Sequence, residues 1–397
     1  MDKTSSFRSK IILLISFFFF VSPGRMMAEI PIVAYLGMPV QESNISRFKE
    51  LREAGFDISI CFYEDTPVDT LLRILDDAQK CKVRLLISSG WVSAQPHVGI
   101  PRLKNHPALY GYFLQDEPWP KDIAETARRY RAMAKQDTLK PTYVNLLPDY
   151  GDGMPKEIKM PPYKQYLQQA STIGLPFISF DFYPIMDSGI RPTWYSCLED
   201  IRQESLRTGK PFWAFALSTP HVIYPQPTLS MLRLQIYSNL AYGARAIQYF
   251  TYWNPKPTDV WDFHNAPIGL DGKRTSTYYL VKKMNQELRS ILPLFDQAEI
   301  TSVNHMGKIP AGTHRLEKLP ATINSLKIVS NRGAIISTMK KNGRQYMLVV
   351  NKDYNSKLQL TIKAKPSVKR ITKNLKETAL KNTYTIDGGD ILLFRLK

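Results

Sequence analysis

Short apolar segments recur at a fairly regular interval through the first two thirds of the chain. Each has five to eight residues and is rich in β-branched or aromatic side chains, which is typical of strands buried on both faces of a parallel sheet. The segments between them have apolar residues at helical spacing and polar residues elsewhere, as at 68–80. The eight predicted strands are 31–37, 57–63, 83–89, 109–115, 142–147, 177–183, 212–217 and 246–253.

Eight strands that alternate with helices predict an α/β fold, the (β/α)8 or TIM barrel, which takes about 250 residues. A doubly wound open sheet is the alternative, but no glycine-rich phosphate loop follows the first predicted strand. A helix predicted at 276–291 would close the barrel, so we assign residues 29–298 to this domain.

The pattern changes near residue 299. Short runs of alternating apolar and polar residues replace the helical spacing, and turn sequences such as Lys-Asn-Gly at 341–343 separate them. These features predict an antiparallel β-sandwich domain over residues 299–397. Its clearest predicted strands are 335–339, 345–350, 358–362 and 391–396.

Residues 1–28 have the features of a secretory signal peptide. A basic start is followed by an eleven-residue apolar run at 11–21 and by the helix-breaking sequence Ser-Pro-Gly. This run is too short to cross a bilayer core of about 30 Å, and no later apolar stretch is long enough. We therefore expect an exported protein, periplasmic or extracellular, without a membrane span.

Cysteine and histidine residues are few. The three cysteines, Cys61, Cys81 and Cys197, are too few for a disulfide scaffold. Buried free thiols are expected, and one bridge between Cys61 and Cys81 is the alternative. The six histidines have no zinc-site spacing, so neither a metal nor an organic cofactor is expected.

The predicted strands end in carboxylates and large aromatic side chains, at the end of the barrel where active sites lie. Aromatic rings stack on pyranose faces, while carboxylates bind hydroxyl groups and transfer the glycosidic proton. Glu117 follows predicted strand four, and apolar neighbours there would raise the pKa of its carboxyl group for a general acid. The candidate catalytic residues are Glu117, Asp116 and Asp181, and the candidate substrate-binding residues are Trp91, Asn145, Tyr183, Trp253, Asp262 and His264.

Several motifs occur between the end of predicted strand four and predicted strand eight, including one on the helix that leads to strand eight. They are Asp-Glu at 116–117, Ser-Phe-Asp-Phe-Tyr-Pro at 179–184, Lys-Pro-Phe-Trp at 210–213, Leu-Ala-Tyr-Gly-Ala at 240–244 and Tyr-Phe-Thr-Tyr-Trp at 249–253. Together they resemble the clan A glycoside hydrolases, most closely the β-galactosidases of family 42. This resemblance implies a barrel followed by a β-domain, hydrolysis of O-glycosidic bonds, and Glu117 as the acid/base.

Two departures from family 42 bear on the mechanism. The nucleophilic glutamate of the family falls at Ala216, and predicted strand seven contains no Asp or Glu. The asparagine that precedes the acid in the family is replaced by Asp116. An Asp–Glu pair at this place is similar to the substrate-assisted β-hexosaminidases of families 20 and 123. There the 2-acetamido oxygen of the substrate attacks the anomeric carbon, the Asp holds the acetamido N–H, and the Glu acts as acid and then base.

Three mechanisms remain open from the sequence. The acetamido group attacks with the help of Asp116, or a water activated by Asp181 or Asp262 attacks with inversion, or the barrel binds sugars without catalysis. A nucleophile from another loop, Glu64 or Asp262, is a further alternative.

The formal net charge of +18 suggests an anionic partner. Residues 29–300 are nearly balanced, with 30 Lys and Arg against 29 Asp and Glu, whereas residues 301–397 carry 19 against 5. The charge therefore does not require an acidic substrate for the barrel. The C-terminal domain has either a solvated basic surface or a weak contact with an anionic glycan or envelope surface. Nucleic acid is not an expected partner, because the sequence has no recognition motif for it.

Overall fold

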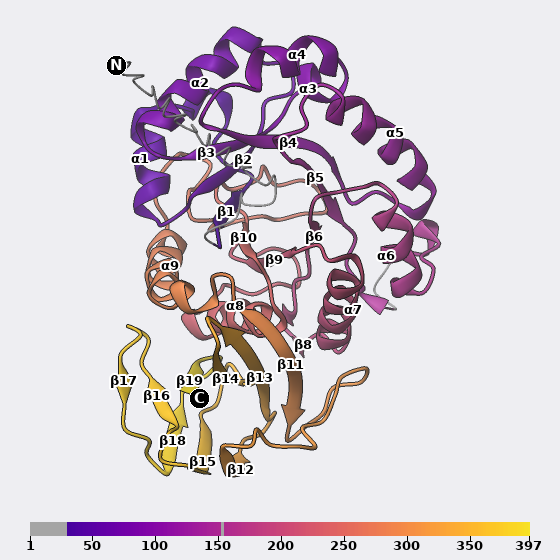
Figure 1. The fold of residues 1–397 in the computed structure, drawn as a ribbon. Coiled ribbons are helices and arrows are strands. Elements are labelled where there is room, and N and C mark those ends of the chain that lie inside the picture. Colours follow the sequence, from indigo (N-terminus) through magenta and orange to yellow (C-terminus); the bar gives the residue numbers. More distant parts are fainter. Residues whose placement is uncertain (1–29, 152–154) are drawn as a thin grey trace, which may run out of the picture.

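The computed structural model describes residues 30–151 and 155–397, in which eight parallel strands form a barrel (Figure 1). All eight lie where the apolar segments predicted them. Two of them end three residues earlier than predicted, at Phe180 and Phe250, because the aromatic residues that follow belong to loops. The strands are β1 (Ile32–Tyr35), β2 (Ile58–Phe62), β3 (Arg84–Ser88), β4 (Leu109–Asp116), β5 (Thr142–Leu146), β6 (Ile178–Phe180), β9 (Phe212–Leu217) and β10 (Ala246–Phe250).

The strands follow one another around the barrel in chain order, and β10 pairs with β1 to close it. The predicted (β/α)8 barrel is therefore confirmed. The proposed signal peptide, residues 1–28, lies outside the described residues.

Helices surround the barrel and bury one face against it (Figure 1). In α2, for example, Leu71, Leu75 and Ala78 are buried at helical spacing. Helix α8 is buried on nearly all sides, because the barrel covers one face and the C-terminal domain another. The helices are η1 (Val40–Glu42), α1 (Ile45–Glu53), α2 (Val68–Lys80), α3 (Gly90–Ser93), α4 (Pro96–Leu103), η2 (Pro120–Asp122), α5 (Ile123–Ala134), η4 (Lys156–Ile158), α6 (Tyr163–Ser171), α7 (Trp194–Thr208), α8 (Leu229–Tyr242) and α9 (Ser276–Phe295).

The C-terminal domain consists of two antiparallel sheets packed face to face, as predicted. The larger has the order β11-β13-β14-β19-β16-β17 and the smaller β12-β15-β18. Apolar side chains of both sheets form their shared core, while the other face of the larger sheet packs on α8. The strands are β11 (Glu299–Met306), β12 (Ile323–Val329), β13 (Ala334–Lys341), β14 (Arg344–Asn351), β15 (Leu358–Ala364), β16 (Lys369–Ile371), β17 (Glu377–Thr378), β18 (Thr383–Ile386) and β19 (Ile391–Arg395); a hairpin of β7 (Ile185–Met186) and β8 (Gly189–Ile190) lies in the loop after β6.

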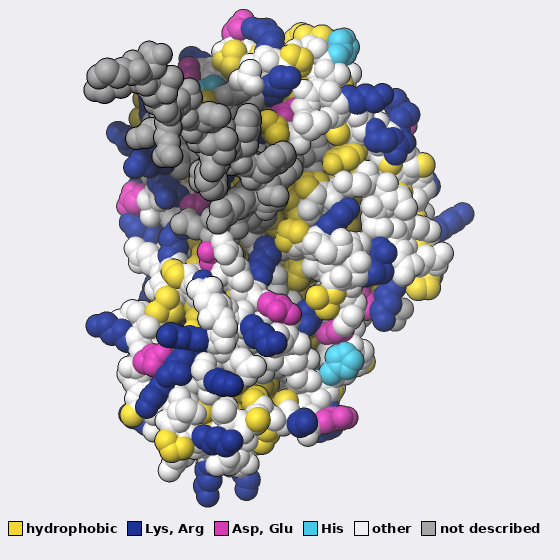
Figure 2. Space-filling model, viewed as in Figure 1, with side chains coloured by type: hydrophobic (Ala, Val, Ile, Leu, Met, Phe, Trp, Pro, Cys, Tyr) yellow, Lys and Arg dark blue, Asp and Glu magenta, His cyan; other side chains and the backbone are white. Residues whose placement is uncertain are grey.

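Lys and Arg side chains outnumber Asp and Glu on the face of this domain seen in Figure 2. This agrees with the uneven charge distribution along the sequence. All three cysteines are buried and free, so the predicted free thiols are confirmed. Among the described residues, no helix has both the length and the apolar character needed to cross a bilayer.

The barrel interior changes from apolar to polar along its axis. The rings of Phe177 and Trp213 stack in parallel at its N-terminal end, with centroids 4.1 Å apart. Above them Tyr143, Ser179 and Gln248 are fully buried and hydrogen-bonded to one another. The C-terminal end opens into a cavity.

Candidate active site

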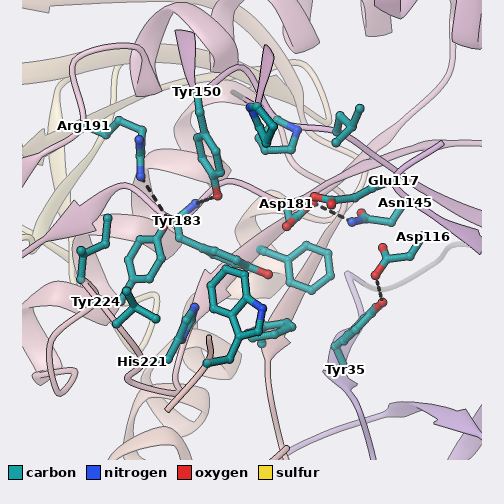
Figure 3. A pocket seen from close by; sticks show the side chains of 18 of the residues that line it. Tyr35, Asp116, Glu117, Asn145, Tyr150, Asp181, Tyr183, Arg191, His221 and Tyr224 are labelled. Atoms are coloured by element: carbon teal, nitrogen blue, oxygen red, sulfur yellow. Dashed lines mark hydrogen bonds between the residues drawn. The ribbon is translucent and has the colours of Figure 1, made fainter. Parts of the chain in front are cut away.

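A cavity of about 480 Å³ lies at the C-terminal end of the barrel (Figure 3). This is the place where barrel enzymes carry their active sites, and its volume lies in the range of small-molecule sites. Its polar and aromatic lining residues include Tyr35, Asp116, Glu117, Asn145, Tyr150, Asp181, Tyr183, Arg191, Phe215, His221, Tyr224, Phe250, Trp261 and Phe263.

Three carboxyl groups come from the ends of two strands. Asp116 is the last residue of β4, Glu117 follows it, and Asp181 follows β6. The register of β4 against β5 shifts at Gln115, whose side-chain oxygen accepts hydrogen bonds from Thr126 and Arg129 on α5. Gln115 therefore faces the helices, and the next residue, Asp116, faces the cavity.

The backbone of Glu117 is in the left-handed region, with φ at 43°. A residue with a side chain adopts this conformation at a cost, and such residues concentrate at functional sites. The Glu117 N–H donates to the carbonyl oxygen of Asn145 at 2.9 Å, which holds this turn in place. As a result, the carboxyl group of Glu117 lies beside that of Asp181 (Figure 3).

Burial and the neighbouring carboxyl groups together set the protonation of Glu117 and Asp181. Burial, the negative charges of Asp181 and Asp116, and the hydrogen bond with Asp181 raise the pKa of Glu117 to about 10. Burial and the charge of Asp116 raise the pKa of Asp181 to about 7, against hydrogen bonds from Asn145 and Glu117. At neutral pH Glu117 is therefore protonated and donates to Asp181. A carboxyl group in this state can act as a general acid.

Asp116 is the carboxyl group most open to the cavity. Its Oδ2 accepts a hydrogen bond of 2.7 Å from the hydroxyl group of Tyr35, at the end of β1. Loss of water around the carboxyl group, at the base of the cavity, raises the pKa of Asp116, while the hydrogen bonds from Tyr35 and Asn145 oppose this shift by favouring the carboxylate. Asp116 thus presents an oriented acceptor to a ligand.

The amide of Asn145 is oriented by the polar layer beneath it. Its Oδ1 accepts from Ser179 Oγ at 2.9 Å, and Ser179 Oγ in turn accepts from Gln248 Nε2 at 2.9 Å. With its oxygen held there, the amide nitrogen points to the carboxyl cluster and donates to Asp181 Oδ1 at 2.7 Å.

The opposite wall of the cavity is aromatic. The rings of Tyr183 and Phe250 lie 5.3 Å apart, and Phe215 packs against Tyr183 at 6.4 Å. At the mouth, the rings of Trp261 and Phe263 stack with centroids 5.9 Å apart, and Trp261 is 44% exposed. Such surfaces suit the apolar faces of sugar rings.

The side chains of β9 are oriented differently from what the resemblance to family 42 implied. Its residues Trp213, Phe215 and Leu217 face the barrel interior. Ala216, the position expected for the family nucleophile, instead packs in the layer between the strands and the helices. Its inward-facing neighbour Phe215 lines the cavity, so neither position offers a carboxylate.

Five of the nine predicted site residues line the cavity: Asp116, Glu117, Asn145, Asp181 and Tyr183. Trp91 and Trp253 do not. Trp91 is half-buried on the short helix α3 and packs against the outer apolar layer. Trp253 lies beyond the end of β10, where its ring packs in the same layer beneath the guanidinium group of Arg47. Both predictions assumed that an aromatic residue at a strand end points inward.

Asp262 and His264 also lie outside the cavity lining. The carboxylate of Asp262 accepts the backbone N–H of Val222 at 2.5 Å and so joins two loops at the rim. His264 Nδ1 donates to the carbonyl oxygen of Asp262 at 2.7 Å. The residues on either side of Asp262, Trp261 and Phe263, are the ones that line the cavity.

The sequence analysis missed Tyr35, Arg191, His221 and Trp261. The end of β1 would have indicated Tyr35, and the aromatic content of the loop after β10 would have indicated Trp261. His221 Nδ1 donates to the carbonyl oxygen of Thr219 at 2.9 Å, and burial lowers the pKa of its imidazole, so it is a neutral lining residue at neutral pH. Arg191 follows the β7–β8 hairpin, and no local sequence pattern predicts that it lines the cavity.

A barrel followed by a C-terminal sandwich is the architecture that the resemblance to clan A glycoside hydrolases implied. Residues 154–291 match the profile of the β-galactosidases of glycoside hydrolase family 42. The predicted similarity to this family is therefore confirmed for residues 154–291, from η4 into α9; Asp116 and Glu117 precede the matched residues. A comparison with curated protein sequences gives no significant match.

Several solved β-galactosidase structures share the fold. The enzyme from Bacillus circulans sp. alkalophilus has a TM-score of 0.64 at 10% identity, over 95% of this chain and 100% of that chain. A family 42 enzyme from G. stearothermophilus has a TM-score of 0.58 at 10% identity, over 94% and 98%. The enzyme from Marinomonas ef1 has a TM-score of 0.50 at 10% identity, and the match covers 67% of this chain and only 60% of that longer one.

Proposed function

We propose that this protein is a glycoside hydrolase that cleaves an O-glycosidic bond of an oligo- or polysaccharide, with Glu117 as the general acid. The observation that carries this proposal is the buried position of Glu117 beside Asp181 and Asp116, because burial and these two carboxyl groups keep a proton on Glu117 at neutral pH. The aromatic wall across the cavity and the family 42 match of residues 154–291 support a sugar as the ligand.

The position of the carboxyl groups favours one mechanism over the others. Retaining enzymes place a nucleophilic carboxylate about 5–5.5 Å from the acid, and inverting enzymes place a base about 6.5–9.5 Å away to leave room for a water. Asp181 shares a hydrogen bond with Glu117, so no water fits between them. Asp262 is bound to the Val222 N–H at the rim, and Glu64 accepts a hydrogen bond from Ser88 outside the cavity lining.

We therefore assign the attack to a 2-acetamido group of the substrate. Its carbonyl oxygen forms a bond to the anomeric carbon while the glycosidic C–O bond breaks and Glu117 gives its proton to the leaving oxygen. Asp116 accepts a hydrogen bond from the acetamido N–H and stabilises the positive charge of the oxazolinium intermediate. Glu117, now a carboxylate, removes a proton from the water that opens this intermediate at the anomeric carbon.

Paired aryl glycosides test both parts of this proposal. We expect turnover of N-acetylhexosaminides, inhibition by a thiazoline analogue of the intermediate, and little turnover of the matching glycosides that lack the acetamido group. Equal turnover of both series would exclude the substrate-assisted mechanism while leaving a glycosidase. Binding of sugars without any product across a broad glycan panel would instead identify a non-catalytic binding protein.

A matched variant separates the carboxyl cluster from other acidic residues at the strand ends. Glu64 follows β2, outside the cavity lining. We expect Glu64→Gln to keep the wild-type rate and Asp116→Asn to lose most activity on acetamido substrates. Loss of activity in both variants to the same degree would show that the assay reports folding and not the carboxyl cluster.

We also propose that the protein works after export, because the sequence of residues 1–28 has the pattern of a signal peptide. Expression of the full chain in a bacterial host tests this. The mature protein should be recovered outside the cytoplasm with an N-terminus near Glu29. An uncleaved chain that stays in the cytoplasmic fraction would contradict it.

A further inference from the structure

A second cavity, of about 270 Å³, lies where the barrel meets the C-terminal sandwich. The barrel contributes Arg191 and Tyr195, and the sandwich contributes Lys308, Arg332 and Lys352, together with apolar residues. Four of its ten lining residues are cationic and none is acidic. Within residues 30–151 and 155–397, none of these four cations forms an ion pair with a carboxylate.

Lys352 is the most unusual of these cations because it is only 3% exposed. Its ammonium group donates to the carbonyl oxygen of Lys308 at 2.5 Å and to His305 Nδ1 at 3.1 Å. Its third N–H has no acceptor among the described residues. A buried cation without a counter-ion is unfavourable. Burial and the charge of Lys308 accordingly lower the pKa of Lys352 to about 7.

No carboxylate among the described residues pairs with Lys352. The histidine beside it, His305, is fully buried, and its Nε2 is 2.8 Å from the hydroxyl group of Tyr242. The ring of Tyr195 lies 5.7 Å from the ammonium group. An anion in the cavity would supply the missing negative charge.

Arg191 connects this cavity to the candidate active site, because it lines both. Its guanidinium group donates to the Tyr224 hydroxyl group at 3.1 Å and lies 4.2 Å from the ring centroid of Tyr150. Both tyrosines line the cavity of the carboxyl cluster (Figure 3). Arg191 is thus the residue that the two cavities share, between the carboxyl cluster and the cations of the sandwich.

We infer that the second cavity is a subsite for an anionic substituent of the glycan, a carboxylate or a sulfate group, held by Arg191, Arg332 and Lys352. Guanidinium groups bind both oxyanions through paired hydrogen bonds, and an ammonium group adds a point charge. The inference rests on the proposed function for the identity of the ligand as a sugar. It adds that the substrate is acidic, which the nearly neutral barrel sequence did not indicate.

Calorimetric titration of the full-length mature protein tests this inference. The probes are a sulfated N-acetylhexosamine disaccharide, the corresponding uronate-containing disaccharide and a neutral disaccharide of the same backbone. We expect an anionic probe to bind at least about tenfold more tightly than the neutral one, the effect of one charge-assisted hydrogen bond. Preference for the sulfated probe would identify a sulfate ester as the substituent, and preference for the uronate probe a carboxylate. Equal affinity for all three probes would overturn the inference.

Two variants and one control assign the effect to this cavity. Arg332→Gln and Lys352→Met should each remove most of the preference for the anionic probe. Arg344→Gln, an exposed arginine of the same domain outside the cavity, should keep it. Thermal unfolding of each variant verifies that it is folded. An Arg332→Gln variant that is folded and keeps the full preference would also overturn the inference.

Failure of this inference differs from failure of the proposed function. Preferential binding of an anionic probe without product release would support the anionic subsite and contradict the proposed hydrolase activity. Hydrolysis of neutral and anionic substrates that bind with equal affinity would support the hydrolase activity and contradict the anionic subsite.

Discussion

Replacement of Asn145 by leucine tests the electrostatics of the carboxyl cluster. Asn145 is 2% exposed and Asp181 is 8% exposed. The hydrogen bond between them is 2.7 Å long and is one of the interactions that hold the pKa of Asp181 down against burial. Leucine has a similar size but cannot donate. The variant should therefore favour the protonated form of Asp181.

The size of the effect follows from the type of bond that is lost. A hydrogen bond to a charged group contributes about 1.5–3 kcal/mol, and one pKa unit corresponds to about 1.4 kcal/mol. The pKa of Asp181, about 7 in the wild type, should therefore rise by about 1–2 units in Asn145→Leu. The sign is upward because the lost donor stabilises the carboxylate.

Carbon-13 NMR of carboxyl-labelled protein measures this shift directly, and it requires no substrate. The resonance of Asp181 is assigned from its loss in Asp181→Asn. Gln115→Leu is the matched control, since Gln115 is an amide on the same wall that faces α5 and not the cavity. A pKa of Asp181 that moves by less than about 0.5 units in Asn145→Leu, or equally in both variants, would refute the reasoning, because the lost bond should be worth at least about 1 unit.

The remaining predictions concern stability and ligand binding. Phe177→Ala should destabilise the fold by about 3–5 kcal/mol in urea unfolding, because the ring stacked on Trp213 leaves a cavity, whereas Tyr279→Ala at a 58% exposed site should change little. Trp261→Ala should weaken sugar binding about 2- to 10-fold in calorimetric titration with an unchanged melting temperature, because the ring is a half-exposed stacking surface. Glu287 accepts hydrogen bonds from Arg233 and Lys373, which lower the pKa of its carboxyl group. Glu287→Gln should therefore reduce the melting temperature at neutral pH, and calorimetry should show the difference from wild type vanish as the pH falls through the range where Glu287 becomes protonated.

The sequence was sufficient to predict the barrel because its strands are buried on both faces. Such strands appear as continuous apolar runs, and eight of them with helices between leave few alternative folds. The change to period-two patterns near residue 299 marked the sandwich for the same reason: only one face of each strand is buried there. These patterns are local, so they can be recognised in the sequence without knowledge of the tertiary structure.

The candidate site was only partly predictable, because a strand end does not reveal which side chain faces inward. A shift in register turns Gln115 outward and Asp116 inward. On β9, Phe215 and not Ala216 faces the cavity. The carboxyl cluster was found because two adjacent acidic residues at one strand end leave at least one of them inside.

The loop residues of the site could not be placed from the sequence. Arg191 reaches the cavity from beyond the β7–β8 hairpin. Its place in the second cavity depends on where the sandwich domain packs against the barrel. Trp261 and Phe263 line the cavity while Asp262 between them holds Val222. Each of these arrangements depends on contacts between segments that are far apart in the chain.

The role of Glu117 as a general acid is tested most directly by its dependence on the leaving group. Glu117→Gln keeps the size of the side chain but cannot donate the proton to the glycosidic oxygen. On an N-acetylhexosaminide with a poor leaving group, kcat/KM should fall by about 10²–10⁴, and on the dinitrophenyl glycoside, which needs little protonation, the loss should be far smaller. Full activity of Glu117→Gln on the poor leaving group would contradict the account.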